Sequence, residues 1–564
     1  MDRTSAESCS SSCNGRNFCS LWSNLCDRQH LALTVTWPFN AFDTTRTMRH
    51  AQKHVSRETC VDEDTAPPPK RFVPKRDPGP QLDMMSNYTP LDLFSLFIDR
   101  TAFSHLCSNI NKQAAKNIAK GKKYPWTMLE ETEFHHFLGL VFYFCLVKLK
   151  HIIDYWRRDT FFSIPFPPTV MTRDRYRTIS WNIHMSDPDT DVENDRKRGT
   201  EEHDKLFRLR PLLDTLTAAC KSHYHPKQNL STDERMGSTK AHTGMTRYMK
   251  NKPTKWGFKL FVLADSSNGY TVDFKIYTGK CKFTRGRGLS YDTVMSLMDQ
   301  NYLGGGYNLY VDSFYTSPCL FKDLLKINVG ACGTYRDQEG MGTIRWIRDG
   351  PIVFVKWMDT REVSVCSTIH PAYTGDKVSR RTKDQAGRWG TKHTPRPNPI
   401  IDYNKHMGGV DLSDQLVQYY TAHRKTMRWY RTLFYHFLDI AGTNAFILHQ
   451  EISEKRGQKV LTHKQFIEEL TAQLLGTPIK SPPAPAPAEH LPVAISNQED
   501  PDRRASYGRR SCAYCRQTEN KKMSTPWKCQ KCDVPLCMIL DRNCFLKYHS
   551  VPGNRLDSDL ATKA

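Results

Sequence analysis

A cluster of cysteines near the end of the chain constrains its fold more than any other feature. Within 38 residues it holds seven potential ligands: Cys512, Cys515, Cys529, Cys532, Cys537, Cys544 and His549. CxxC spacing lets two thiolates bind one ion, and a structural zinc ion takes four ligands. So short a segment has little core and needs metal to fold. We predict a cysteine-rich zinc-binding module at residues 511–550, with one Zn²⁺ or, if Asp541 or another group completes a second site, two.

The chain as a whole is long and strongly basic. Its 564 residues include 81 Lys and Arg against 59 Asp and Glu, a formal charge of +22. This charge favours a polyanionic partner, and nucleic acid is the first candidate. The longest apolar run, residues 137–147, is too short to cross a bilayer, and the N-terminus has no signal-peptide pattern. We expect an intracellular protein with no membrane partner.

Composition and periodicity divide the rest of the chain. Residues 1–86 are polar and irregular, and the basic, proline-rich stretch at 67–76 suits a nuclear import signal or a solvated linker equally. Helical periodicity dominates residues 87–227 and 421–476, whereas strand patterns dominate residues 228–397. A Pro/Ala and basic linker at 477–510 precedes the cysteine-rich module. The expected fold class is α/β plus α.

Four acidic residues are candidates for a metal site. Asp233 and Asp312 each lie at or just beyond the end of a predicted strand, and a glycine pair at 408–409 precedes a predicted helix that carries Asp411 and Asp414 on one face. The last two also suit a first helical turn, where the helix dipole favours negative charge. Ends of strands and a helix start can converge in a layered fold. Carboxylates there suit a pair of Mg²⁺ ions that supports in-line attack on a phosphodiester.

Basic residues interleaved with aromatic ones suggest where nucleic acid binds. Between residues 240 and 287 there are 11 Lys and Arg against two Asp, and a second basic cluster ends at Trp429. Such segments combine phosphate neutralisation with stacking surfaces. A solvated hairpin is the alternative for the first segment, in which Trp256 and Phe258, at the start of a predicted strand, suit core packing better than base contact. A buried indole is the alternative for Trp429. The DNA-binding candidates are Lys252, Lys255, Lys259, Arg424, Lys425, Arg428 and Trp429.

Several motifs resemble, in order and spacing, those of piggyBac-type transposases. They are SxDERM at 231–236, YMKNKPTKWGFK at 248–259, VDSFYTS at 311–317, STIH at 367–370, and the run from YNKHMGGVD to RKTMRW that ends at 429. The similar stretch covers roughly residues 88–475, and the ending CDVPLC to CFLKYH is similar to the family's zinc-binding tail. The motifs are specific enough to guide expectations about the fold and the site.

The resemblance implies an RNase H-like catalytic core, residues 228–328 and 398–420, split by a β-rich insertion at 329–397. It implies a helical dimerisation and DNA-binding domain built from residues 87–227 and 421–476. Asp233, Asp312 and Asp411 match the catalytic aspartates, which bind Mg²⁺ or Mn²⁺, and Asp414 matches a fourth, supporting acid.

The activity implied is cut-and-paste transposition by a nuclear homodimer. Members of the family cut double-stranded DNA at the terminal repeats of the element, form hairpin ends as intermediates and join the ends to TTAA targets. By this resemblance, Trp429 would stack on an unpaired base at the transposon end. The alternative is a domesticated descendant that binds DNA or a chromatin partner without catalysis.

Three departures from the family pattern matter. Ser313 stands where the family usually has Asn, and the spacing from Cys537 to Cys544 is longer than usual. The N-terminal region lacks the family's acidic tract. We therefore expect changes at the second metal site and in the contact that the Asn side chain makes in the family. We expect the catalytic chemistry to be retained.

Overall fold

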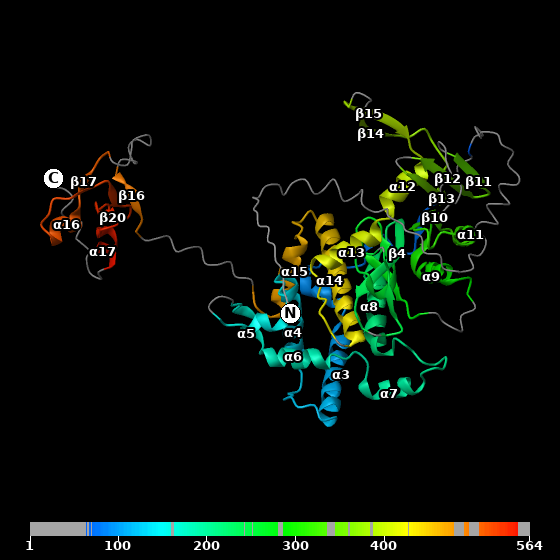
Figure 1. The fold of residues 1–564 in the computed structure, drawn as a ribbon, viewed down its shortest axis with the longest axis horizontal. Helices are drawn as coiled ribbons and strands as arrows, with labels where there is room; N and C mark the ends of the chain where they lie inside the picture. Colours follow the sequence, from blue (N-terminus) through cyan, green and yellow to red (C-terminus); the bar gives the residue numbers. More distant parts are fainter. Residues whose placement is uncertain are drawn as a thin grey trace, which may run out of the picture.

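The structure is a computed structural model that describes residues 64–550, apart from 65–66, 69, 160–162, 242, 251, 280–285, 336–344, 359–360, 384–386, 427, 479–489 and 496–506. Within this part, its helices and sheets give the chain the mixed α/β character expected from the sequence (Figure 1). No helix of the described residues combines the length and apolar character needed to cross a membrane.

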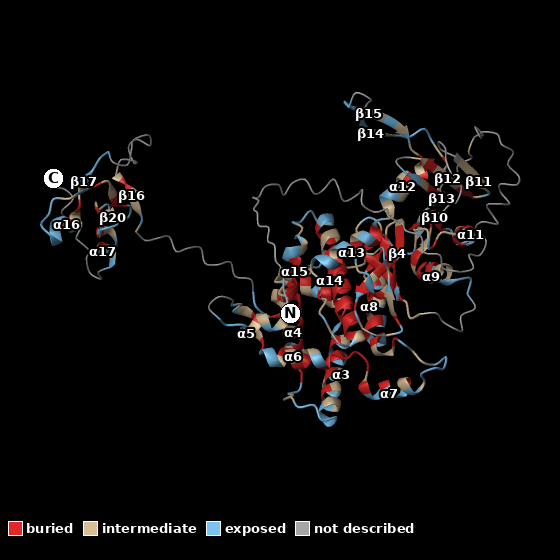
Figure 2. Ribbon diagram, viewed as in Figure 1, coloured by how far each residue is buried: buried red, intermediate tan, exposed pale blue. Residues whose placement is uncertain are grey.

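Helices from both sides of the central segment pack together. The N-terminal set is α2 (Pro90–Ser95), α3 (Arg100–Ala119), α4 (Glu131–Leu146), α5 (Phe166–Val170), α6 (Arg173–Asn182), α7 (Pro188–Arg196) and α8 (Arg210–Ser222), with 3₁₀ turns η1 (Ile152–Trp156) and η2 (Phe207–Leu209). The later set is α14 (Trp429–Lys455) and α15 (His463–Leu474), which contact α2 and α4. Nearly every residue of α14 from Tyr430 to Leu448 is buried. This all-round burial makes α14 the centre of the helical part (Figure 2).

A mixed sheet forms the centre of the molecule. Its first strands are β4 (Asn229–Ser238), β5 (Thr246–Tyr248), β6 (Trp256–Asp265) and β7 (Thr271–Ile276), followed by β9 (Asn308–Val311) and β10 (Gly330–Thr334). The strands β4, β9 and β10 run parallel, whereas β6 is antiparallel to β4 and to β7. The central order is therefore β7, β6, β4, β9, β10.

Helices cover both faces of this sheet. The helices α8, α13 (Gly409–Tyr419) and α14 pack on one side, and α9 (Leu289–Leu297) and α11 (Pro318–Lys326) pack on the other (Figure 1). The short helix α10 (Gln300–Leu303) leads into β8 (Gly304–Gly305), and α12 (Asn398–His406) leads into α13. Because helices cover both faces, the strands and the inner sides of the helices share one large apolar core.

The segment expected as an insertion at 329–397 does not form a separate sheet throughout. Its first strand, β10, is part of the core and pairs in parallel with β9. The strands β13 (Glu362–Ser367), β12 (Ile352–Met358) and β11 (Arg345–Asp349) then extend the same sheet, which has nine strands. The strands β14 (Lys377–Lys383) and β15 (Trp389–Pro395) form a two-stranded ribbon. Sequence patterns show strands but not their pairing, so this continuity was not predictable.

The chain immediately before α2 is ordered, although we expected residues 1–86 to be disordered. The strand β1 (Val73–Pro74) pairs with β8, and β2 (Gly79–Pro80) pairs with β3 (Tyr224–His225). Arg76 donates a hydrogen bond to the carbonyl of Ser222 at 2.9 Å. The basic, proline-rich stretch is thus partly an edge strand, a place where proline is tolerated. Residues 1–63 lie outside the described part.

The cysteine-rich module is built from short elements. They are β16 (Pro492–Ala494), β17 (Arg510–Ser511), α16 (Ala513–Thr518), β18 (Ser524–Thr525), β19 (Trp527–Cys529), β20 (Met538–Ile539), β21 (Arg542–Asn543) and α17 (Cys544–Ser550), at the left of Figure 1. The strand β16, which we expected to be part of the linker, pairs with β19. The module therefore begins near residue 490 rather than 511, and most of the linker proper lies outside the described residues.

Candidate functional site: an acidic cluster and two cysteine clusters

Two of the predicted aspartates meet where β9 ends beside the middle of β4, so the prediction of a strand end holds for Asp312 but not for Asp233. Asp233 lies in β4 and Asp312 directly follows β9, which runs parallel to β4. Together with Glu234 they place carboxylate oxygens within 4.8 Å of one another. Asp411, in the first turn of α13, lies outside this closest group. Carboxylate oxygens gathered in this way are the ligands that Mg²⁺ and Mn²⁺ prefer.

The electrostatics of the cluster reflect its crowded negative charge. Burial, followed by the charges of Asp233 and Glu234, raises the pKa of Asp312 to about 6. The pKa of Asp411 is raised by desolvation first and then by Asp233. Like charges held together favour protonation unless a cation compensates them. The residues present therefore fit a divalent cation in donor type and in charge.

Glu234 was not singled out in the sequence, and its contacts are largely structural. Lys259 Nζ lies 2.9 Å from Glu234 Oε1, and the Tyr315 hydroxyl donates to the same oxygen at 3.2 Å. The residue is buried. Buried carboxylates need such partners. Its place beside Asp233 in the DER motif is the only sequence signal for it.

The helix α13 is set against the sheet by close backbone contact and an ion pair. A Cβ at Gly409 would lie 2.4 Å from Ser231 Oγ, so only glycine fits there. The chain turns at 407–408, between α12 and α13, where the glycine pair predicts a turn. Buried Arg235 forms a short ion pair with Asp414 and donates to Ser413 Oγ at 2.7 Å. Asp414 is thus a partner of Arg235, which accords with a supporting role.

The predicted DNA-binding residues divide into a partly buried set and an exposed set. Lys252 Nζ lies 2.7 Å from Asp233 Oδ2, inside the acidic cluster. Lys259 is bound to Glu234, and Arg424 donates to the carbonyl of Phe144 at 2.8 Å. Trp429 is half-buried and meets Phe258 edge-on at 6.1 Å. Exposed positions are Lys255, Lys425 and Arg428.

An exposed aromatic pair accompanies Lys255. The rings of Tyr248 and Trp256 lie 5.0 Å apart, and the two side chains are about half exposed (52% and 54%). We expected Trp256 and Phe258 to be core residues, and this holds only for Phe258. The two residues share a face of β6, but Trp256 is the first residue of the strand and lies across from exposed Tyr248.

The first cysteine cluster gathers four thiols. Cys512, Cys515, Cys537 and Cys544 are all buried and have their sulfur atoms within 4.8 Å of one another. Burial raises the pKa of Cys537 to about 11. A thiol this reluctant to ionise becomes a ligand only when a metal supplies positive charge. Four sulfurs in one place fit a tetrahedral zinc site.

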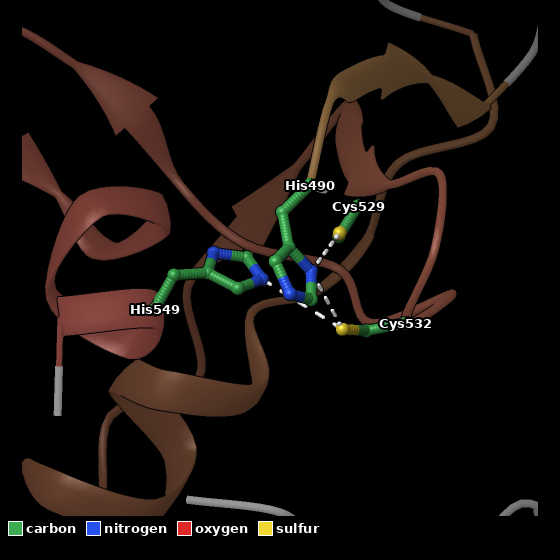
Figure 3. A group of neighbouring side chains, drawn as sticks. All are labelled: His490, Cys529, Cys532 and His549. Carbon is green, nitrogen blue, oxygen red and sulfur yellow. Dashed lines mark hydrogen bonds between the residues drawn. The ribbon is translucent and has the colours of Figure 1, made fainter. Parts of the chain in front are cut away.

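The second cluster contains a residue that we did not predict. His490, Cys529, Cys532 and His549 have ligand atoms within 4.8 Å of one another (Figure 3). His490 Nδ1 lies 3.4 Å from Cys529 Sγ and 3.1 Å from Cys532 Sγ, and His549 Nε2 lies 3.7 Å from Cys532 Sγ. Asp541, which we suggested as the eighth ligand, is exposed and belongs to neither cluster.

Hydrogen bonds to the neighbouring backbone support both histidines as ligands. His549 Nδ1 lies 2.8 Å from the carbonyl of Phe545, which leaves Nε2 facing the cysteines, as metal-binding histidines commonly do. The backbone next to His490 is fixed, because Gln530 N donates to the carbonyl of Leu491 at 2.7 Å. The two four-residue clusters are interleaved along the chain. The long spacing between Cys537 and Cys544 does not separate them, since both lie in the first cluster.

Residues 89–446 of the chain match the protein family described as Transposase IS4. The chain belongs to this family and is of the piggyBac type, as the motifs predicted. PiggyBac transposable element-derived protein 3 of Homo sapiens is 25% identical over 489 residues, which cover 82% of this chain and 76% of that protein. PiggyBac transposable element-derived protein 2 of Homo sapiens is 23% identical over 443 residues, which cover 71% of this chain and 70% of that protein.

A solved structure has a similar fold. The cryo-EM structure of a piggyBac transposase synaptic complex with hairpin DNA matches with a TM-score of 0.60 at 23% identity. The match covers 82% of this chain and 98% of that one. The similarity is one of fold, and both proteins combine helices with a mixed sheet in the matched part.

Proposed function

We propose that the protein is a DNA transposase that cuts and joins DNA by a metal-dependent, cut-and-paste reaction. The observation that carries this proposal is the convergence of Asp233, within β4, and Asp312, directly after the adjacent parallel strand β9. A divalent cation bound there would activate a nucleophile and stabilise the leaving oxygen. Asp233, Asp312 and Asp411 are the proposed ligands, with Mg²⁺ or Mn²⁺ as the ion.

The catalytic core that we propose is RNase H-like. The order β7, β6, β4, β9, β10, with the last three strands parallel, supports this assignment. Asp414 holds α13 through Arg235, and the first turn of this helix carries Asp411 close enough to Asp233 for their charges to interact. The helices α2 to α8 with α14 and α15 are the proposed dimerisation and DNA-binding part, and β11 to β15 are the proposed insertion.

Duplex DNA is the proposed substrate. The similar structure is, by its title, a synaptic complex with hairpin DNA, and this chain carries exposed cations at Lys255, Lys425 and Arg428. Exposed Lys and Arg neutralise phosphates, and Tyr248 with Trp256 offers a stacking surface. We propose that terminal repeats bind across these residues, that strand transfer occurs at TTAA, and that the protein acts as a homodimer in the nucleus.

We propose zinc as the metal of the C-terminal module. Eight thiol and imidazole ligands in two groups of four support two ions. The module would recognise DNA at the element ends or a chromatin partner.

A second candidate is a domesticated protein that binds DNA without cutting it. The human relatives are named as transposable element-derived proteins, which favours keeping this alternative. Such a protein would retain the fold and the zinc module but not metal-dependent cleavage.

A two-plasmid assay separates the candidates. The donor carries a marker between terminal repeats found beside the gene, flanked by TTAA, and the protein is tested as wild type and as Asp312→Asn. Asp323→Asn, which removes an acid of α11 outside the acidic cluster, is the charge-matched control. We expect excision and TTAA insertion from the wild type and the control only. Wild-type excision equal to that of Asp312→Asn, with repeat binding intact, would establish the domesticated alternative.

A further inference from the structure

The ribbon formed by β14 and β15 projects from the sheet, and little of its surface packs against the rest of the protein. The two strands pair with each other over seven residue pairs and form a separate two-stranded sheet. Every residue of β14 except half-buried Val378 is exposed (Figure 2). Isolated two-stranded sheets are marginally stable in water. The ribbon therefore adds exposed surface rather than core.

The base of the ribbon is firmly held. Trp357 Nε1 donates to the carbonyl of Pro395 at 2.7 Å, and Val378 packs against a small cluster that includes buried Tyr310 and Trp357. Arg396 N donates to the carbonyl of Asp376 at 2.8 Å, which closes the two chains together. An arm fixed at its base keeps a defined direction relative to the acidic site on the neighbouring strands.

The charge of the ribbon is strongly one-sided. Residues 377–395 contain six Lys and Arg and a single acid, Asp384. The register places Arg380 directly across from Lys392, two residues of like charge. Like charges directly opposite each other destabilise a strand pair. A sequence that places cations in this way is suited to a polyanion that lies against the ribbon.

We propose that the β14–β15 ribbon is an arm that enters the major groove of duplex DNA. The major groove, about 12 Å wide, admits a two-stranded ribbon, whereas the minor groove is only about 6 Å wide. Seven residues extend roughly 23 Å, the length of about six or seven base pairs. The proposal rests on the DNA-binding part of the proposed function and names the surface and the groove.

Both faces of the ribbon carry cationic residues, which fits insertion between two phosphate backbones. Alternation places Lys377, Arg381 and Lys383 on one face and Arg380 on the other. Trp389, 66% exposed at the far end, lies beneath Lys383, whose Nζ is 5.2 Å from the ring centroid. The paired cation and indole give the end of the arm an apolar surface for base edges such as thymine methyl groups.

The first test is binding of the full-length protein to a labelled 40-base-pair duplex with one central TTAA, in EDTA so that no strand is cut. The variant carries Arg381→Gln and Lys383→Gln, and the control carries Arg71→Gln and Lys75→Gln, exposed residues beside β1 and outside the proposed DNA-binding part. We expect the ribbon variant to bind about tenfold more weakly and its salt dependence to fall by about two phosphates. Equal weakening of the control would reduce the effect to net charge and overturn the proposal.

The second test identifies the groove. Dimethyl sulfate methylates guanine N7 in the major groove and adenine N3 in the minor groove. We expect the wild type to protect guanine N7 at positions that become reactive with the ribbon variant. If the ribbon variant loses protection of adenine N3 instead, the arm does not enter the major groove and the proposal is rejected. If the variant binds and protects DNA as the wild type does, the proposal is also rejected, and an acidic protein becomes the expected partner of the ribbon. Neither readout requires cleavage, so an inactive enzyme leaves this result interpretable.

Discussion

Lys252 and Asp233 form an ion pair inside the acidic cluster, with Nζ 2.7 Å from Oδ2. Burial alone would lower the pKa of Lys252, but the charges of Asp233, Glu234 and Asp411 raise it overall. The ammonium group therefore neutralises one of the carboxylates that we propose as metal ligands. A cation bound to Asp233 competes with this contact.

The competition gives a direct prediction for Lys252→Gln. Without the ammonium group, Asp233 is free for a metal, so Mn²⁺ should bind the DNA-free variant several-fold more tightly than it binds the wild type. Electron paramagnetic resonance titration of free Mn²⁺ measures this. Lys255→Gln is the matched control, because Lys255 is exposed and lies three residues along the same segment. Equal Mn²⁺ affinity in wild type and Lys252→Gln would contradict the competition.

The sequence predicted the acidic cluster better than it predicted the basic one. Asp312 was found because it follows a strand, whereas Asp233 lies within β4, which continues past the end of β9 and so brings the two residues together. The contacts of a lysine have no such local signal in the sequence, because its long side chain can reach any carboxylate nearby. Lys252 and Lys259 therefore became internal partners of Asp233 and Glu234, which no spacing rule indicates.

Long-range pairing accounts for the other differences. Seven metal ligands were evident from their types and spacing, but His490 lies 22 residues before the first of them, in a linker-like composition. Only the pairing of β16 with β19 brings it to Cys529. The same reason explains β10, whose parallel pairing with β9 makes it a core strand rather than the start of an insertion.

The two aspartates of α13 should behave differently when neutralised. Asp414→Asn leaves buried Arg235 without its carboxylate, which should destabilise the fold by about 3 kcal/mol or more. Asp411→Asn breaks no such pair and should leave the melting temperature within about 2 °C of the wild type while abolishing cleavage of an end duplex. Thermal unfolding and strand cleavage are measured on the same preparations. A stable, inactive Asp414→Asn would instead make Asp414 a metal ligand.

His490 should determine how many zinc ions the chain holds. We expect two ions per wild-type chain and about one in His490→Ala, because the second cluster loses a ligand and the all-cysteine cluster remains complete. Elemental analysis gives the ratio, and the visible spectrum of the Co²⁺-substituted protein reports the ligand types. His105→Ala, an exposed histidine of α3, is the control. Two ions retained in His490→Ala would show that another group is the fourth ligand.

A buried carboxyl in α14 should make stability depend on pH. Asp439 is buried and accepts hydrogen bonds from Ala422 N at 2.6 Å and from Thr421 Oγ1 at 2.8 Å. Burial raises its pKa to about 7. The unfolded chain ionises near pH 4. Between about pH 4 and pH 7 the folded state binds the extra proton, so the contribution of Asp439 to stability falls as pH rises and is fully lost above pH 7.

Asp439→Asn isolates this effect, because the amide keeps a carbonyl acceptor and stays neutral at every pH. Buried His436, whose pKa burial lowers to about 3, acts in the opposite direction in both proteins and cancels from the difference. The melting temperature of the variant minus that of the wild type should therefore increase from pH 4 to pH 7 and stay constant above it. Glu454→Gln, at an exposed position of the same helix, is the control and should show no such trend. A difference that is constant from pH 4 to pH 8 would mean that Asp439 is ionised in the folded protein throughout, held by Thr421 and Ala422.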